Sequence, residues 1–347
     1  MFLNEFAAGN ARHDMTGSVE FASLLASAAD LGIPFAPGTR YASHNVVLRH
    51  HRFHFLDWGA ADAPPVVLLH GGHQSAHAWD LVSLALARHY RVLALDQRGH
   101  GDSEWARDVD YSNHTMALDA EAFIATLGLD RPVLVGHSMG GRNAMLMAHR
   151  GQTDMRGPTD MRGPADMRGP ADLRGPADLR GPADLRGLVI VDIGPEISEQ
   201  GRQSIGGFVR ANEEFDDLEE FVANVRKYDP YRPRAHIERT VKYNMLQRPD
   251  GKFISKCDPA PRRLGLLAGR RLQDNLTLAA VAELRLPTLV IRGATSNILE
   301  ADAAERFRDA LPQGALVTVA DCGHNVASQN TKGFLDALAP FLRACLG

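Results

Sequence analysis

A serine flanked by two glycines, in the segment GHSMG at positions 136–140, has the residue types and spacing of a nucleophile on a sharp turn. The segment follows the apolar run Pro132–Val135, which predicts a buried strand, and precedes Arg142–Arg150, which has the composition of a helix. A strand-turn-helix unit would project the hydroxyl of Ser138 from the end of a sheet. Side chains two positions before and after the serine would crowd this turn, so both positions favour glycine. A glycine-rich turn with an incidental serine gives the same pattern, so the motif needs support from other residues.

The elements that would position this serine alternate between short apolar runs and helical segments. The predicted strands are Asn45–Arg49, Phe53–Trp58, Pro65–Leu69, Arg91–Leu95, Pro132–Val135, Leu188–Val191, Pro287–Ile291 and Ala315–Val319, and the predicted helices include Ala76–His89, Ser112–Leu127 and Thr331–Cys345. This alternation predicts an α/β fold with a doubly wound, mostly parallel, eight-stranded sheet. The motif-like segments follow strands, and in such sheets the chemistry gathers at the carboxyl ends of the strands. His50, His51 and His54 fall in a strand-like segment, and we expect them on a solvated face of the sheet.

Composition narrows the classes of function. A formal net charge of −4 argues against nucleic acid as a general partner. The three cysteines are few, odd in number and widely spaced, which suits a reducing cytosol and predicts neither a disulfide framework nor a zinc site. The N-terminal residues lack a basic start and a long apolar core, so we expect no signal peptide. Phe21–Leu31 is apolar at helical spacing but too short to cross a membrane. A cytoplasmic location without a membrane partner is therefore expected.

The chain divides into a core with an extension and two insertions. Residues 1–42 form an N-terminal extension with one amphipathic helix, and residues 43–195 and 286–347 form the core. Residues 153–188 are six near-copies of a six-residue unit of the type ADLRGP, which cannot form a continuous helix because five of the six units end in Gly-Pro. We interpret this array as a tandem duplication in a surface loop, with a spacer or docking arm as the alternative. Residues 196–285 are richly helical and charged, and we expect them to form a helical cap over the strand ends.

Taken together, these motifs resemble the α/β-hydrolase fold family from about Asn45 to the C-terminus, excluding the repeat array. The resemblance is carried, in chain order, by His70-Gly71-Gly72, the run DQRGHGDS at 96–103, GHSMG, the cap, Arg292-Gly293 and Gly323-His324. It implies that Ser138 is the nucleophile and His324 the general base, because a serine hydroxyl attacks only after an imidazole removes its proton. The N–H groups of Gly72 and Met139 would form the oxyanion hole. We expect the run 96–103 to hold the loop beside Ser138 and not to react.

The catalytic acid departs from the family pattern. Many relatives carry an aspartate in a Ser-Asp dipeptide after the Arg-Gly that ends the seventh strand, and this chain has Ser296-Asn297 there. An amide carries no charge to stabilise an imidazolium. Asp192, at the end of the sixth strand, is the preferred substitute, since some family members such as certain haloalkane dehalogenases place their acid there. The alternatives are a structural Asp192 at the junction with the cap, or a slow enzyme in which Asn297 replaces the acid. Glu300 and Asp302 are weaker candidates.

The function expected from this resemblance is hydrolysis of a small ester, thioester or lactone through an acyl-enzyme on Ser138. The partner is then a small-molecule acyl substrate, no metal or organic cofactor is implied, and the oligomeric state is left open. Hydrolysis of a carbon–carbon bond in a ring-cleavage product would use the same triad. A non-catalytic protein that binds a small ligand is the alternative from another class, and it rests on the loss of the usual acid at Asn297. A serine at position 138 argues against the dehalogenases and epoxide hydrolases of this fold, which use an aspartate there.

Overall fold

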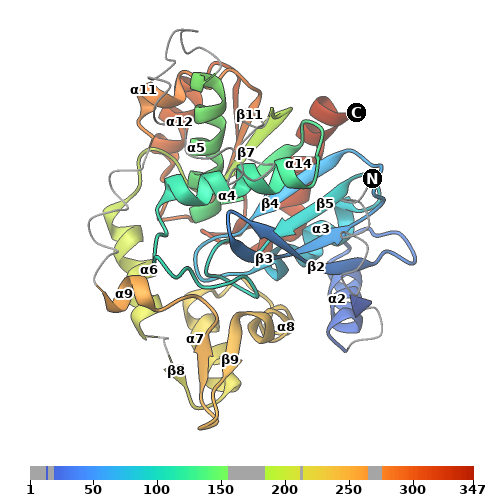
Figure 1. Cartoon of the computed structure of the whole chain (residues 1–347), viewed down its shortest axis with the longest axis vertical. Helices are drawn as coiled ribbons and strands as arrows, with labels where there is room; N and C mark the ends of the chain where they lie inside the picture. The colour runs from blue at the N-terminus through green and yellow to red at the C-terminus, as the bar shows by residue number, and fades with distance from the viewer. Residues whose placement is uncertain (1–12, 15–18, 155–183, 212–213, 265–275) are drawn as a thin grey trace, which may run out of the picture.

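One large sheet organises the part of the chain that this computed structural model describes (Figure 1). The described residues are 13–14, 19–154, 184–211, 214–264 and 276–347. Its strands are β1 (His13–Asp14), β2 (Tyr41–Leu48), β3 (His51–Trp58), β4 (Pro65–Leu69), β5 (Arg91–Leu95), β6 (Val133–His137), β7 (Gly187–Val191), β11 (Thr288–Gly293) and β12 (Gly314–Val319). They lie in the order β1-β2-β3-β5-β4-β6-β7-β11-β12. Neighbouring strands pair in parallel from β5 to β12 in this order. The pairs β1–β2, β2–β3 and β3–β5 are antiparallel.

This arrangement confirms the predicted fold class, an α/β-hydrolase fold with a doubly wound, mostly parallel sheet. The eight predicted strands are all present among the described residues, with ends that differ by up to four residues. The ninth, β1, contains only two residues and pairs with β2 through His13 and Asp14. A strand of this length has no recognisable pattern in the sequence.

Helices cover both faces of the sheet. The helices of the main body are α2 (Val19–Asp30), η2 (Ala76–Trp79, a 3-10 helix), α3 (Asp80–Leu86), α4 (Asn113–Thr126), α5 (Met139–Asp154), α12 (Ala301–Ala310), α13 (Val326–Gln329) and α14 (Thr331–Leu346). Alternate residues of β4 enter different cores, with Val66 and Leu68 on one side and Val67 and Leu69 on the other. The first core includes Phe334 of α14, and the second includes Phe123 of α4 and Phe307 of α12. Each of these fully buried rings contributes roughly 2–3 kcal/mol.

Residues 196–285, which we call the cap segment, contain a small sheet as well as helices. Among the described residues of this segment, the elements are α6 (Glu199–Ala211), β8 (Glu214–Phe215), α7 (Leu218–Tyr228), α8 (Arg234–Asn244), β9 (Met245–Gln247), β10 (Phe253–Ser255), α9 (Ala260–Arg263) and α11 (Leu278–Val281). The strands pair antiparallel in the order β8-β10-β9. The helices agree with the richly helical composition of this segment, whereas the small sheet has no counterpart in the sequence analysis, because strands of two or three residues are too short to show an alternating pattern. In Figure 1, α7, α8, β8 and β9 lie together at the lower end of the molecule.

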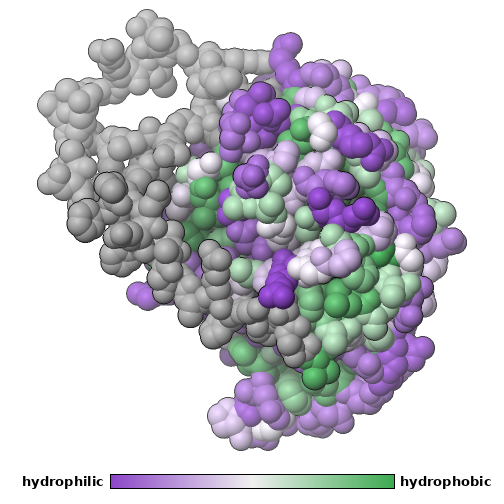
Figure 2. All heavy atoms as spheres, turned by 90° about the vertical axis from the view of Figure 1, so that its right-hand side faces the viewer, coloured by the Kyte–Doolittle hydropathy of each residue, from purple (hydrophilic) through white to green (hydrophobic). Residues whose placement is uncertain are grey.

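The N-terminal helix α2 packs onto the main body through Phe21, Leu24 and Ala28. Figure 2 views the molecule from the right-hand side of Figure 1 and shows hydrophobic residues interspersed with hydrophilic ones over this face.

Within the described residues, none of the helices combines the length and the apolar character needed to span a membrane. Most of the repeat array lies in residues 155–183, outside the described residues, so its interpretation as a surface insertion stays a prediction.

Candidate active site

The turn that carries Ser138 has the geometry that its glycines predict. Strand β6 ends at His137, helix α5 begins at Met139, and Ser138 lies between them with φ +52°. A Cβ at Gly136 would lie 2.3 Å from the carbonyl oxygen of Gly140, and a Cβ at Gly140 would lie 2.4 Å from that of Leu69. Contacts this short are impossible for real side chains, so both positions require glycine. The left-handed backbone of Ser138 is strained for a residue with a side chain and is retained where a functional group must project from the sheet.

Three residues from distant parts of the chain form one line of hydrogen bonds. The hydroxyl of Ser138 lies 2.9 Å from Nε2 of His324, and Nδ1 of His324 lies 2.8 Å from Oδ2 of Asp192. Because Asp192 accepts from Nδ1, the Nε2 lone pair of the neutral imidazole is directed at the hydroxyl of Ser138. This tautomer, assigned from the hydrogen-bond partners, is the one that can remove a proton from a serine.

Asp192 is held by four groups at the end of β7. Its carboxylate is fully buried; Oδ1 accepts from the N–H of Gly293 at 2.9 Å, and Oδ2 accepts from Ser296 Oγ as well as from His324. Its own N–H donates to the carbonyl of Ile291 at 2.8 Å, and φ is +52°. These bonds hold the carboxylate in one orientation against the imidazole.

Asn297 and the two weaker acid candidates lie elsewhere. Asn297 is exposed, and its neighbour Ser296 is the member of the dipeptide that contacts Asp192. Glu300 is exposed at the start of α12, and Asp302 pairs with Arg306 at 2.9 Å on the surface of that helix. The structure therefore brings Asp192, and none of these three side chains, into hydrogen-bond contact with His324.

Gly72 lies beside Met139, the residue that directly follows Ser138. A methyl group at Gly72 would lie 4.0 Å from Sδ of Met139, which places these two residues next to each other. Met139 is the first residue of α5, and the N–H groups at a helix start have no partner within the helix and carry partial positive charge. The loop before Gly72 is fixed by His70, whose Nδ1 donates to the carbonyl of Gly71 at 2.7 Å and whose Nε2 accepts from the N–H of Gln97 at 3.0 Å.

His137, the residue before Ser138, fixes the loop that carries His324. Its Nε2 donates to the carbonyl oxygen of His324 at 2.8 Å. Burial, and then the nearby charge of His324, lower the pKa of His137 to about 3. His137 therefore stays neutral at ordinary pH, and one tautomer is enough to donate this bond.

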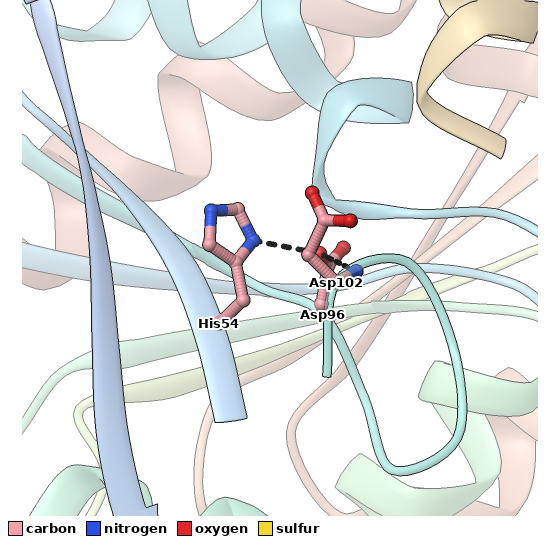
Figure 3. A group of neighbouring side chains, drawn as sticks. All are labelled: His54, Asp96 and Asp102. Carbon is pink, nitrogen blue, oxygen red and sulfur yellow. Dashed lines mark hydrogen bonds and ion pairs between the residues drawn. The ribbon is translucent and has the colours of Figure 1, made fainter. Parts of the chain in front are cut away.

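The run 96–103 is built around the buried carboxylate of Asp96 (Figure 3). His54 on β3 donates to Oδ2 of Asp96 at 2.7 Å, the N–H of Asp102 donates to the same oxygen at 2.9 Å, and the N–H of Ala76 donates to Oδ1 at 2.5 Å. Burial alone would raise the pKa of Asp96, but these hydrogen bonds and the charges of His54 and His70 hold it below its ordinary value. This agrees with the expected structural role of the run.

His54, Asp96 and Asp102 place one oxygen or nitrogen each within 4.8 Å of one another, close enough to consider a metal ion. The candidate ligand atoms of these residues, however, already have hydrogen-bond or ion-pair partners. The other ring nitrogen of His54 lies 2.8 Å from Ser43 Oγ, and the carboxylate of Asp102 pairs with Lys256 at 2.5 Å. We interpret the group as a hydrogen-bonded support for the sheet end. The expectation that His54 lies on a solvated face is wrong, because the residue is only 5% exposed and its side chain turns inward to Asp96.

The buried histidines predict a loss of stability in mild acid. Burial first, and the charge of His100 second, lower the pKa of His70 to about 4, and the pKa of His137 is about 3, against 6.5 for an unperturbed histidine. The stability linked to such a group is present above its unfolded pKa and is lost as the pH falls toward its folded pKa. At pH 5, each histidine should lower the free energy of unfolding by about 2 kcal/mol relative to pH 7.5.

Urea unfolding at pH 7.5 and pH 5 measures this effect. His70→Gln retains an acceptor for the N–H of Gln97 but has no titratable group, so it should flatten the pH dependence. An equal loss of stability in the variant and the parent chain would contradict the assignment to His70.

Several supporting residues have no signal in the sequence that singles them out. Asn143 of α5 donates to Gln97 at 2.8 Å, and Gln97 donates to the carbonyl of His70 at 2.6 Å, so the loops around Ser138 are joined through buried amides. Amides of this kind are common in loops, and only their three-dimensional partners distinguish them. Ser296 could have been found from its place in the dipeptide that usually holds the acid.

A model of the alpha/beta hydrolase family matches residues 66–337 of this chain, which includes Ser138, Asp192 and His324. The chain belongs to the alpha/beta hydrolase family. This alpha/beta hydrolase is 26% identical over 333 residues to Esterase Rv0045c of Mycobacterium tuberculosis, covering 93% of this chain and 95% of the relative. It is 29% identical over 299 residues to the sn-1-specific diacylglycerol lipase ABHD11 of Mus musculus, covering 84% of each.

Among solved structures, the alpha/beta hydrolase superposes on E-2-(acetamidomethylene)succinate hydrolase with a TM-score of 0.71 at 22% identity. The match covers 87% of this chain and 99% of the other, and at this identity it shows the fold alone. Together with the family match, the esterase and lipase relatives support a hydrolase, without indicating its substrate.

Proposed function

We propose that this protein is a serine hydrolase that cleaves a small ester, thioester or lactone through an acyl-enzyme on Ser138. The observation that carries the proposal is the hydrogen-bond line from Ser138 Oγ to His324 Nε2 at 2.9 Å and from His324 Nδ1 to Asp192 Oδ2 at 2.8 Å. A nucleophile, a base and an oriented carboxylate in this order are what acyl transfer requires. The esterase relative supports the same class of reaction.

In the proposed mechanism, His324 removes the proton of Ser138 as its Oγ attacks the acyl carbon. Negative charge develops on the former carbonyl oxygen, and the N–H groups of Gly72 and Met139 stabilise it. Asp192 stabilises the imidazolium that forms and holds its orientation. The imidazolium then protonates the leaving oxygen or sulfur, which departs and leaves an acyl-enzyme. A water molecule, deprotonated by His324, attacks the acyl carbon and releases the acid and free Ser138.

The carboxylate of Asp192 helps to separate the proposed function from its two alternatives, a ligand-binding protein and a carbon–carbon hydrolase. The alternative of a non-catalytic ligand-binding protein rests on the loss of the usual acid at Asn297, and the 2.8 Å contact between Asp192 Oδ2 and His324 Nδ1 argues against it. Hydrolysis of a carbon–carbon bond would use the same residues and is included in the substrate test below. We propose a small-molecule acyl compound as the partner, and the reaction as proposed needs no metal or organic cofactor.

Labelling with a fluorophosphonate probe tests the proposal. We expect stoichiometric modification at Ser138, located by peptide mass spectrometry, because the probe reacts with a serine activated by an adjacent imidazole. A panel of short-chain nitrophenyl esters, thioesters, lactones and dienoic ring-cleavage products would then define the substrate class. Absence of labelling together with absence of turnover across the panel would contradict the proposal. Turnover of the dienoic compounds alone would favour the carbon–carbon hydrolase.

A further inference from the structure

A buried carboxylate of the cap segment lies against the loop that carries His324. Asp229 follows the last residue of α7 and is only 1% exposed. Its Oδ1 accepts a hydrogen bond from Nε2 of Gln329 at 2.6 Å, and its Oδ2 accepts from Nδ2 of Asn325 at 3.3 Å. Both donors belong to the main body, so this aspartate bridges the cap segment and the core.

The two donors hold the loop on either side of the base. Asn325 is the residue directly after His324. Gln329, at the end of α13, uses its Oε1 to accept from the N–H of Gly323 at 2.6 Å, and Gly323 is the residue directly before His324. The carboxylate of Asp229 therefore orients the side chain of one neighbour of His324, Asn325, and the amide of Gln329 that binds the other neighbour, Gly323.

The same line of amides reaches the proposed oxyanion hole. Oδ1 of Asn325 accepts from Nε2 of Gln74 at 3.1 Å, and Oε1 of Gln74 accepts from the N–H of Gly71 at 3.0 Å. Gly71 directly precedes Gly72. One connected set of hydrogen bonds thus runs from the cap segment, past the base, to the loop that would stabilise the oxyanion.

We propose that Asp229 is a positioning residue that sets the placement of His324 and of the Gly71-Gly72 loop through Asn325, Gln329 and Gln74. The proposal rests on the proposed function, because it assigns His324 its role as base. A carboxylate suits this position because both of its oxygens accept from amide N–H groups. An asparagine at 229 offers one acceptor and would direct its own N–H groups at one of the two donors. The substitution would therefore remove one of the two hydrogen bonds to residue 229 with almost no change in side-chain volume.

Kinetics of Asp229→Asn, with Asp258→Asn as the matched control, test the inference. Asp258 is also a largely buried aspartate of the cap segment, and it accepts from Tyr111 of the main body at 2.5 Å, but none of its described bonds reaches the His324 loop. We expect Asp229→Asn to lower kcat for the best ester of the panel by about 10- to 100-fold, with KM changed less than about threefold, since a small displacement of reacting groups costs this much. The fluorophosphonate labelling rate should fall by a similar factor. Asp258→Asn should keep kcat and labelling within about threefold.

Two further variants keep the test decisive if Asp229→Asn folds poorly. Gln329→Leu and Asn325→Leu remove the same bonds from the side of the core, and each should reproduce the loss of kcat. Combining Asp229→Asn with Asn325→Leu should cost less than the product of the single effects, because the residues act through one set of bonds.

Full kcat and labelling rate in folded Asp229→Asn, or equal losses in Asp229→Asn and Asp258→Asn, would overturn the positioning role. Both results would leave labelling of the parent chain at Ser138 intact. They are therefore distinguishable from a failure of the proposed function itself, in which the parent chain is neither labelled nor active.

Discussion

Replacing Ser138 by alanine should lower kcat for any ester substrate by about 10⁴- to 10⁶-fold, the largest effect expected of any single substitution in this chain. The substitution removes the Oγ that lies 2.9 Å from His324 Nε2 and leaves the rest of the turn in place. Some acceleration over water should survive, because the proposed oxyanion donors at Gly72 and Met139 are unaffected.

The fold should tolerate this change. Alanine at position 138 must adopt the same left-handed backbone as serine, at φ +52°, and the glycines on both sides already relieve the crowding. We expect the free energy of unfolding to change by less than about 1 kcal/mol. Steady-state kinetics with the best ester and thermal unfolding measure the two effects. Ser83→Ala on α3, where the serine is fully buried and belongs to no part of the proposed machinery, is the matched control. Retention of more than a trace of kcat in Ser138→Ala would place the nucleophile elsewhere.

The second large effect concerns the acid. Asp192→Asn should lower kcat by about two to four orders of magnitude with little change in KM. The asparagine amide can donate to Nδ1 of His324, which would place the ring proton on Nε2, where it faces the hydroxyl of Ser138. The imidazole could then no longer accept the serine proton. In the native arrangement the hydroxyl of Ser296 donates to the carboxylate of Asp192, and an amide N–H in its place could not accept this hydrogen bond.

Asn297→Asp separates the two possible positions of the acid. Because Asn297 is exposed and Asp192 already contacts the imidazole, a carboxylate at 297 should change kcat by less than about threefold. A strong rise of kcat in Asn297→Asp, together with a small effect of Asp192→Asn, would show that the usual position is the catalytic one. The pair of variants in the same ester assay therefore decides which residue acts as the acid.

The sequence by itself determined the sheet and the turn of the nucleophile. Continuous apolar runs such as Pro65–Leu69 and Arg91–Leu95 coincide with β4 and β5, because strands buried on both faces cannot alternate with polar residues. Gly136 and Gly140 identify the turn because any Cβ there would collide with backbone. Burial on both faces of a strand and close backbone contacts each restrict the residue types allowed at a position, so the residue types alone express these features.

Only the tertiary structure decided which carboxylate lies against His324, which way His54 faces and which residues Asp229 bridges. Asp192 and Asn297 are both polar residues after a strand, and only the packing of β7 beside β11 brings one carboxylate to His324, 132 positions away in the chain. His54 has the same residue type as its exposed neighbour His50, and the buried Asp96 opposite it determines which way it faces. Asp229, Asn325 and Gln329 belong to segments about a hundred residues apart. Their side chains find these hydrogen-bond partners only when the cap segment packs against the loop that carries His324, and no local sequence pattern predicts that contact.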